Sequence, residues 1–381
     1  MTKNPETKTL LFPPTSRELL IALNAAPRIS RPAVCRLAQE LSRWSEASEP
    51  PDVLAAAVGV PRAQMEKALA VRETAAALAA REEAAAGKLG ARIVLEGDPA
   101  YPAGLAQLSL PPPVLYVAGE IPEGPGLAIV GSRKADAYGH EVAEVFARTL
   151  AAAGVAVVSG FARGIDAAAH RGALAAEGGR TVAVLGCGLG VDYPTGHQKL
   201  AQEVAARGAL VSELPCGMPP RAWHFPVRNR VIAALSAGVL VVQATPRSGS
   251  LITVRHALEI GREVYAVPGR IFDERSLGPH ALLRDGARLV QHPQDVLDDL
   301  YPRRAGAPPP GPLNAPPAPA LPDPPEGLPR EILAVLSPGS FQVPEDLAAR
   351  VEVPVDRVLG ALLELELGGW VQRLPGPLYG R

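Results

Sequence analysis

Glycine-rich turns that follow short aliphatic runs are the feature that most constrains the fold of this chain. Four such turns read Val-Gly-Ser-Arg (130–133), Ser-Gly-Phe-Ala-Arg-Gly-Ile-Asp (159–166), Gly-Cys-Gly (186–188) and Arg-Ser-Gly-Ser (247–250). Glycine lets the backbone approach a ligand closely, and a helix that starts just after it points free N–H groups at an anion. With basic residues in or beside most turns, the pattern predicts a phosphate-binding surface on an α/β sheet.

The aliphatic runs themselves predict a sheet of mostly parallel strands. They cover residues 127–130, 155–159, 181–185, 209–212, 239–243, 264–267 and 287–290. Helical patterns such as 138–153 and 165–177 separate them, and runs without polar alternation are typical of buried parallel strands. A proline-flanked segment at 111–117 is expected to add an edge strand.

The segments on either side predict further domains. Apolar residues at helical spacing between 16 and 87 indicate a small helical domain, placed at 1–90, before an α/β domain at 91–302. Proline dominates 303–328, which we interpret as an extended linker. The remaining module, 329–381, predicts a winged helix. Its expected elements are helices at 331–336, 344–350 and 355–365, and a hairpin of 370–374 with 378–380 about a turn at 375–377.

Composition excludes some functional classes. At 381 residues, 47% of them hydrophobic and 20% charged, the chain is expected to fold into two or three domains. A net charge of −1 argues against a uniformly basic nucleic-acid binder but leaves local patches open. Neither the start of the chain nor its longest apolar stretch, 231–244, fits a membrane segment, so we expect a cytoplasmic protein with no membrane partner.

The cysteines predict no metal site. Cys35, Cys187 and Cys216 are odd in number and lack the spacing of metal ligands, so reduced thiols are expected. Cys187 lies between two glycines of a candidate site, but no motif supplies a base to activate it.

The first two turns each allow a functional and a structural interpretation. Arg133 could pair with a phosphate while Ser132 and backbone N–H groups hold its oxygens, or it could face solvent beside a tight turn. In the longer turn, Asp166 and His170 share a helix face and could form an acid/base pair, or a cap and an orienting contact beneath the glycine loop. We favour the structural role for this pair, because no nucleophile or metal cluster joins it.

A third basic cluster combines cations with aromatic rings. Arg228, Asn229 and Arg230 follow Trp223 and Phe225, a combination that suits single-stranded nucleic acid because phosphates need cations and splayed bases can stack. The aromatic pair could equally anchor the core. The turn at 247–253 supplies hydroxyls and N–H groups but no lysine, and the absence of a Walker A sequence argues against ATP hydrolysis by a P-loop.

Taken together, these strings resemble the DprA family of DNA-processing proteins. The match covers roughly residues 101–300. The residues that carry it are 129–133, 159–166 with Ala169 and His170, Tyr193-Pro194, 225–230, 248–253 and 266–269.

The resemblance implies a fold and a function. It implies an extended Rossmann-like core that binds single-stranded DNA, dimerises, protects incoming DNA and loads the RecA recombinase during natural transformation, with duplex DNA left open as a further ligand. It implies no enzymatic activity, no cofactor and no metal. The DNA-binding residues that it implies, with the basic neighbours added, are Ser132, Arg133, Ser159, Gly160, Arg163, Gly164, Lys199, Arg221, Phe225, Arg228, Asn229, Arg230, Ser248, Gly249 and Ser250. Within this set Lys199 is expected just outside the phosphate pocket.

The flanking modules resemble the family's sterile-alpha-motif-like and winged-helix-like domains but depart from a DNA-binding pattern. Residues 25–29 lack the glycines with which a helix-hairpin-helix turn approaches a phosphate. The expected recognition helix, 355–367, carries Asp356, Glu364 and Glu366 against Arg357, which a phosphate-lined groove would repel. A protein-contact or regulatory role is expected there.

Two rival functions remain. A nucleotide hydrolase related to the lysine-decarboxylase-like phosphoribohydrolases would need a catalytic glutamate in the loop at 247–253, which has no carboxylate until Glu259. A dinucleotide-dependent oxidoreductase would need the Gly-x-Gly-x-x-Gly fingerprint, which residues 131–133 do not provide.

Overall fold

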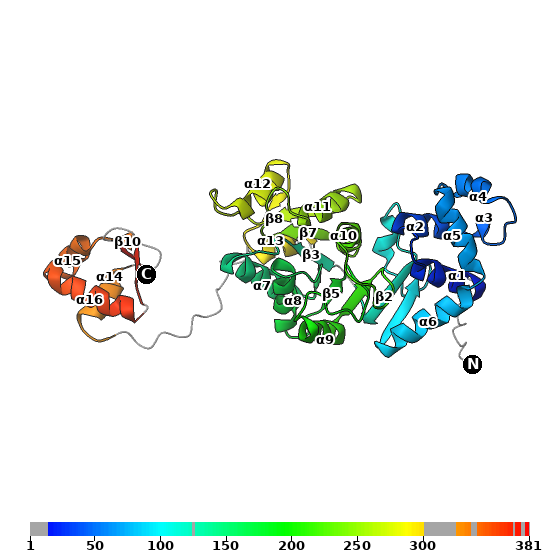
Figure 1. Ribbon diagram of the computed structural model, residues 1–381. Helices are drawn as coiled ribbons and strands as arrows, with labels where there is room; N and C mark the ends of the chain where they lie inside the picture. The colour runs from blue at the N-terminus through cyan, green and yellow to red at the C-terminus, as the bar shows by residue number, and fades with distance from the viewer. Residues whose placement is uncertain are drawn as a thin grey trace, which may run out of the picture. The chain divides into compact units, whose positions relative to one another are not determined.

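The computed structural model describes residues 14–123, 126–300, 325–336, 341–368, 370–374 and 378–380. The chain divides into one unit at 1–307 and another at 308–381 (Figure 1). The predicted linker lies outside the described residues up to residue 324, and the hairpin turn at 375–377 lies outside them as well. The boundary predicted at residue 90 stays a prediction.

A nine-stranded sheet forms the centre of the first unit, in the order β1-β2-β6-β5-β4-β3-β7-β8-β9. From β6 to β9 every pairing is parallel, and β2 pairs with β1 and β6 in antiparallel fashion. The strands are β1 (Ala91–Leu95), β2 (Val114–Gly119), β3 (Gly126–Val130), β4 (Ala156–Ser159), β5 (Thr181–Val184), β6 (Ala209–Ser212), β7 (Gly238–Val241), β8 (Glu263–Ala266) and β9 (Arg288–Leu289). The predicted mostly parallel α/β sheet is confirmed.

One strand prediction needs correction. The segment at 111–117 does form a strand, β2, but β2 lies between β1 and β6 and is not an edge. The outermost strand is β1, whose short sequence Ala-Arg-Ile-Val-Leu directly follows helix α6 (Ala75–Lys88) and was not expected. Its register against β2, with Ile93 opposite Tyr116, completes the sheet on this side.

The strand order reverses direction between β3 and β7. Chain order runs outward from β3 through β4 and β5 on one side, then returns to β7, β8 and β9 on the other. Val130 at the end of β3 lies opposite Val241 at the end of β7. In open α/β sheets ligands bind at such a switch point, beyond the carboxyl ends of the strands, because the two flanking loops diverge there.

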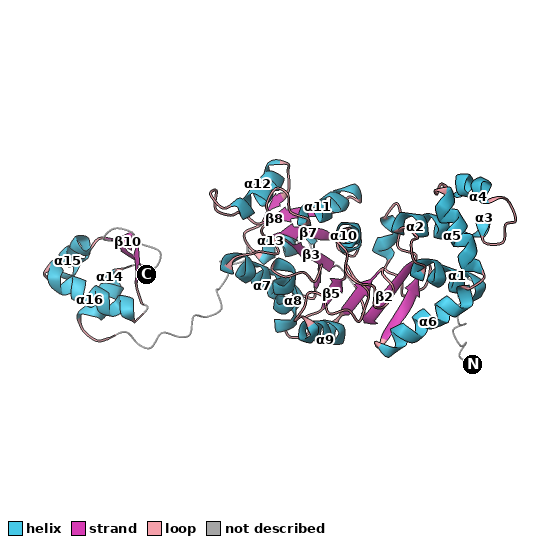
Figure 2. Cartoon of the chain, in the orientation of Figure 1, coloured by secondary structure: helices cyan, strands magenta, loops and turns pink. Residues whose placement is uncertain are grey.

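Helices cover both faces of the parallel part, which explains the unbroken aliphatic strands (Figure 2). On β3, Leu127 and Ile129 pack with α7 (Ala137–Ala152) and α8 (Ile165–Ala175). Ala128 and Val130 face the other layer, with α10 (His224–Ala234) and α11 (Ser250–Glu259). The other helices here are α9 (Gln198–Arg207), α12 (Leu277–Arg284) and α13 (Pro293–Leu300), and the 3-10 turns are η1 (Ala103–Gln107) and η2 (Glu274–Ser276).

The N-terminal helices share a hydrophobic core with the sheet. Trp44, fully buried, belongs to the same core cluster as Tyr116 of β2 and Leu185 beyond β5. These helices are α1 (Pro14–Ala25), α2 (Arg31–Gln39), α3 (Leu41–Trp44), α4 (Pro51–Val58), α5 (Arg62–Arg72) and α6. The predicted helical segment is confirmed, and its packing fixes it against the β1–β2 end of the sheet.

The second unit is a small winged-helix fold. Ile332, Leu347 and Leu362, one from each helix, are fully buried at its centre. Its elements are α14 (Leu328–Val335), β10 (Phe341–Gln342), α15 (Pro344–Val351), α16 (Val355–Leu367), β11 (Gln372–Leu374) and β12 (Leu378–Gly380). The strands pair in the order β10-β12-β11, so the predicted three helices and hairpin are confirmed. Among the described residues of the whole chain, no helix is both long and apolar enough to cross a bilayer.

Candidate functional site

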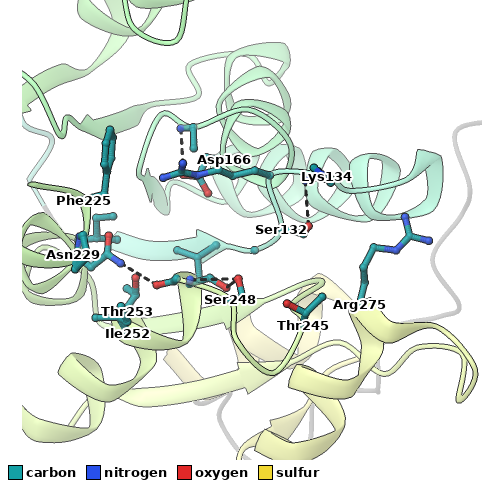
Figure 3. A pocket seen from close by; sticks show the side chains of 18 of the residues that line it. Ser132, Lys134, Asp166, Phe225, Asn229, Thr245, Ser248, Ile252, Thr253 and Arg275 are labelled. Atoms are coloured by element: carbon teal, nitrogen blue, oxygen red, sulfur yellow. Dashed lines mark hydrogen bonds between the residues drawn. The ribbon is translucent and has the colours of Figure 1, made fainter. Parts of the chain in front are cut away.

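A cavity of about 1450 Å³ opens at the switch point (Figure 3). Its walls come from the carboxyl ends of β3, β7 and β8 and from the start of α10. The predicted site residues that line it are Ser132, Arg133, Arg221, Phe225, Arg228, Asn229, Ser248, Gly249 and Ser250. Segments more than 100 residues apart in sequence thus meet where the sheet topology predicts a ligand.

The turn after β3 directs an arginine over an aromatic ring. The Ser132 N–H donates to the Gln243 carbonyl at 2.6 Å, which ties the turn to the end of β7. The Arg133 guanidinium then lies 5.0 Å from the centre of the Phe225 ring, an attractive cation–π geometry. Phe225 packs in turn against Tyr193, with ring centres 5.4 Å apart. Arg133 is therefore a cavity side chain with an open guanidinium edge, not one that merely faces solvent.

The start of α11 offers two hydroxyls and a helix N-terminus without an acidic cap. The Ser248 and Ser250 hydroxyl oxygens lie 2.7 Å apart, and Asn229 Nδ2 holds the loop by donating to the Gly249 carbonyl at 3.0 Å. The Ser250 N–H at the start of α11 donates to the Ser248 hydroxyl in a long hydrogen bond of 3.4 Å, whereas the Asp136 carboxylate closes α7 by accepting from the Gly139 N–H at 2.9 Å. Because a helix N-terminus without an acidic cap favours negative charge, α11 is better placed than α7 to receive an anion.

Two buried side chains of opposite charge, Arg228 and Asp166, form the floor of the cavity. Arg228 is 5% exposed and donates to the carbonyls of Gly160, at 2.7 Å, and Val184. Burial lowers the pKa of Arg228 to about 10 and raises the pKa of Asp166, and the attraction between the two opposite charges opposes both shifts. Since the Arg228 donors are directed at backbone carbonyls, this arginine organises the floor more than it offers a free cation.

The glycine-rich loop at 159–166 is packed inside the protein. Ser159 is fully buried, and its hydroxyl donates to the Ile129 carbonyl at 2.6 Å. Gly164 has φ +79°, and a Cβ there would lie 2.2 Å from the Ser132 carbonyl oxygen. Gly160 lies against Arg228, where a Cβ would meet the guanidinium at 2.8 Å. The structure does not bring Ser159, Gly160 or Gly164 to the cavity wall.

Asp166 and His170 do not act on each other. Asp166 accepts a hydrogen bond from the Ala162 N–H at 3.2 Å, so it orients the glycine loop from beneath, as the structural interpretation predicts. The His170 Nδ1 lies 2.7 Å from the Thr181 hydroxyl, which itself donates to the Val157 carbonyl, so Nδ1 is the donor to Thr181. Nε2 is buried without a partner, and burial lowers the pKa of His170 to about 3. His170 is a neutral core histidine.

Three further predicted residues lie away from the cavity. Arg163 is exposed but does not line it. The Lys199 side chain is 90% exposed on α9, with its ammonium 3.8 Å from Glu203. Arg230 donates to the Leu110 carbonyl at 2.8 Å and pairs with Glu213, so it fastens α10 to the loop after β6.

The comparisons with known proteins agree with this topology. Residues 92–301 match the family described as DNA recombination-mediator protein A, and residues 316–377 match the DprA winged helix domain. The chain belongs to the DprA family.

Two named relatives are similar to this chain over much of their own length. Protein Smf of Escherichia coli is 45% identical over 285 residues, which is 72% of this chain and 74% of Smf. DNA processing protein DprA of Bacillus subtilis is 41% identical over 203 residues, 52% of this chain and 68% of that protein.

Among solved structures, DprA of Streptococcus pneumoniae aligns with a TM-score of 0.63 and 32% identity, over 74% of this chain and 97% of that one. A structure of the Helicobacter pylori DNA processing protein A, described as showing its single-stranded DNA binding mode, aligns with a TM-score of 0.50 and 30% identity, over 55% of this chain and 95% of that one.

Sequence reasoning missed cations that this DprA-family chain places at the cavity. Lys134 directly follows Arg133, so its place in the same turn could have identified it as a site residue. Arg270 and Arg275 lie in the segment after β8, and Arg275 bridges Asp136 and Asp273 at 2.8 Å each. Nothing in the local sequence marks these two, because their position follows from β8 lying beside β7 in the sheet.

The turn at 247–253 brings no carboxylate to the cavity, and the carboxylates that line it, Asp166, Asp273 and Glu274, come from other segments. Glu259, the first carboxylate after the turn at 247–253, is the last residue of α11 and pairs with His256 at 2.9 Å. Cys35, Cys187 and Cys216 are free thiols, as predicted, and burial raises the pKa of each to about 11. Within the described ranges, no group of three or more His, Cys, Asp or Glu residues could hold a metal ion.

The winged helix presents an apolar stripe on its third helix. Leu359, Leu363 and Leu367, spaced four residues apart on α16, are 43%, 55% and 81% exposed. Asp356, on the same helix, adds negative charge to it. An apolar, acidic helix suits contact with a protein better than with a phosphate backbone.

Proposed function

We propose that this chain is a non-enzymatic recombination mediator that binds single-stranded DNA through the switch-point cavity. The observation that carries the proposal is the chemistry of the cavity wall. Cationic side chains, serine hydroxyls and a helix N-terminus without an acidic cap converge on one open space at the carboxyl edge of the sheet. These are the groups that hold phosphate oxygens without reading bases.

The charge balance of the wall supports an anionic ligand. Arg133, Arg221 and Arg270 line the cavity and form no salt bridge with any described residue, and the same is true of Lys134. Three acidic residues line the cavity, Asp166, Asp273 and Glu274, against six cationic ones. Asp166 lies beside Arg228, and Asp273 pairs with Arg275. A net positive wall suits a ligand with several phosphates.

The aromatic residues favour a single strand over a duplex. Phe225 lies under Arg133 inside the cavity, and Trp223 at the start of α10 is 61% exposed. Unstacked bases can lie on such rings, whereas the bases of a duplex are stacked on one another. The Helicobacter pylori relative, whose structure is described as showing a single-stranded DNA binding mode, supports the same ligand.

The finer function is a proposal that follows from family membership. We propose that the chain protects incoming DNA, acts as a homodimer that places two cavities on one strand, and loads the RecA recombinase during natural transformation. Family membership as a DNA recombination mediator supports this role. Strand exchange by RecA on protein-coated DNA, with and without this chain, tests the loading step, and light scattering of the purified protein tests the dimer.

Fluorescence anisotropy of a labelled oligonucleotide tests the DNA ligand. The wild type is expected to bind single-stranded DNA in preference to duplex, with an affinity that falls steeply as salt rises. Arg133→Ala is expected to weaken binding about tenfold or more and to reduce the slope of log affinity against log salt by about 1. Binding that is absent, or indifferent to salt and to Arg133, would overturn the proposal. Release of free base from nucleoside monophosphates would favour the hydrolase instead.

A further inference from the structure

A second cavity, of about 590 Å³, lies beside the switch-point cavity. It is bounded by the loop that joins α1 to α2, by the segments after β5 and β6, and by the start of α10. Arg221 and Arg228 line both cavities. The two spaces are therefore neighbours that share a wall, and a strand bound in one can extend into the other.

The shared wall carries an exposed indole. Trp223 is 61% exposed, so it is not the core anchor that the sequence allowed as an alternative. The Arg221 guanidinium lies 5.2 Å from the centre of its ring, and the His224 ring packs against its edge with centres 5.8 Å apart. These contacts hold the indole in place while most of its surface remains open, the condition for stacking on a flat ligand.

The rest of the second cavity suits a base better than a phosphate. Ile29, Leu185, Leu214 and Val227 give it an apolar lining. Two cations lie on its N-terminal wall. Arg28 is exposed, whereas Arg31 is held in place by donating to the Asn24 carbonyl at 2.7 Å and to the Glu213 carbonyl at 3.2 Å. Apolar walls with a few fixed polar groups are typical of sites for flat organic rings.

Hydrogen bonds between the helical segment and the sheet hold this cavity open in advance. Asn24 Nδ2 donates to the Glu213 carbonyl at 3.0 Å, and Arg31 bonds to the same carbonyl. The loop at 26–32 is thus fastened to the segment after β6. A preformed wall lowers the entropic cost of binding, because no loop has to be ordered when the ligand enters.

We propose that the second cavity holds a nucleobase of the strand whose phosphates occupy the switch-point cavity, with the base stacked on Trp223. The inference rests on the proposed function, since the strand must first be gripped through its phosphates. Arg221, which lines both cavities, lies where the DNA strand would pass from the phosphate site to the base site. The N-terminal helical segment then contributes to DNA binding through a base, which explains why its loop at 25–29 needs no glycines for a phosphate.

The test compares a thymidine oligonucleotide with an abasic oligonucleotide of the same length. Both carry the same phosphates, so the ratio of their affinities measures the bases alone. The wild type is expected to bind the thymidine strand at least about fivefold more tightly, the lower end for stacking of one base on an aromatic side chain. Trp223→Ala is expected to reduce this ratio by that factor while leaving the affinity for the abasic strand unchanged. Tyr138→Ala is the matched control, since Tyr138 is 51% exposed but lines neither cavity.

The outcomes distinguish failure of the base site from failure of the proposed function. If Trp223→Ala leaves the affinity ratio at its wild-type value, the base does not stack on Trp223, and phosphate binding in the switch-point cavity is unaffected by this result. If the wild type binds neither strand, the proposed function fails, and the inference fails with it. Photo-crosslinking with 5-iododeoxyuridine gives an independent reading without a variant: a crosslink to Trp223 supports the site, and crosslinks confined to residues outside the second cavity overturn it.

Discussion

Two glycine-rich loops that look alike in sequence have opposite roles in this structure. The loop at 159–166 is mostly buried, apart from Ala162 and the exposed Arg163. The Ser159 hydroxyl donates to the Ile129 carbonyl, and Phe161 adopts φ +59° while packing against His170 and His197. The loop at 248–250 is open, with paired serine hydroxyls and a glycine whose Cβ would meet nothing within 4 Å. Glycine serves backbone packing in the first loop and leaves space for a ligand in the second.

The comparison shows what a glycine-rich turn means physically. At Gly164 the chain comes so close to the Ser132 carbonyl that no side chain fits. At Gly249 φ is −62°, which any residue adopts, so the glycine is not required by the backbone. A glycine that lets the backbone approach a ligand cannot be told, from the sequence, from a glycine that lets it approach another part of the protein.

The largest expected effect is the loss of the carboxylate beneath the buried loop. Asp166→Ala leaves Arg228 buried without its counter-charge, and we expect the free energy of unfolding to fall by about 3–5 kcal/mol. In the open loop, Ser250→Ala is expected to change it by about 1 kcal/mol at most. Urea unfolding of both variants measures the difference, and equal losses would contradict the contrast between the loops.

The glycines themselves provide the next test. Gly164→Ala is expected to lower the free energy of unfolding by roughly 2–4 kcal/mol, because the residue has φ +79° and its Cβ would strike the Ser132 carbonyl. Gly249→Ala is expected to lie within about 0.5 kcal/mol of the wild type, since space is open and φ is ordinary. Tolerance of alanine at 164 in the same unfolding experiment would show that the buried loop is not packed as described.

Acid should destabilise the helix behind the buried loop. The pKa of His170 is about 3 in the native protein against 6.5 in a free side chain, so the unfolded state takes up the proton first. The free energy of unfolding is therefore highest above pH 6.5 and falls as pH drops from 6.5 toward 3. His170→Asn, whose amide nitrogen can replace Nδ1 as the donor to Thr181, is expected to remove roughly 2 kcal/mol of the loss between pH 7 and pH 5. A pH profile that the substitution leaves unchanged would show that His170 takes up a proton as readily in the native state as in the unfolded state.

The smallest expected effect concerns cations outside the cavity. Arg163→Ala and Lys199→Ala are each expected to lower the affinity for single-stranded DNA by about twofold at most, through long-range charge alone. Arg270→Ala, inside the cavity, is expected to cost more than either. Anisotropy at fixed salt ranks the three, and a loss at Lys199 as large as at Arg270 would extend the DNA path beyond the cavity.

Much of the fold was predictable because buried parallel strands leave an unbroken aliphatic signature. The seven strands expected between 127 and 290 are all present. β1 was missed because it is short and lies at the end of a helix, and its antiparallel partner β2 was therefore taken for an edge. The winged helix was predictable because its helices carry clear apolar periodicity.

The site was predictable where the ligand-facing residues directly follow a strand. Arg133 and Ser248 come from turns at the carboxyl ends of β3 and β7, and both line the cavity. Ser159 follows the same rule but lies at the end of β4, one strand from the switch point, where packing takes up its hydroxyl. Arg270 and Arg275 could not be found, because only the strand order brings the segment after β8 to the cavity.

The central claim is that the switch-point cavity holds an anionic strand, and a charge placed in its open loop tests this most directly. Gly249→Asp introduces a carboxylate where the structure has empty space, and Gly249→Ala controls for the added volume. Anisotropy with labelled single-stranded DNA is expected to show at least about a hundredfold loss for the aspartate variant, a much smaller change for alanine, and unaltered urea unfolding for both. If the aspartate variant binds DNA as tightly as the alanine variant, the strand does not pass through this cavity.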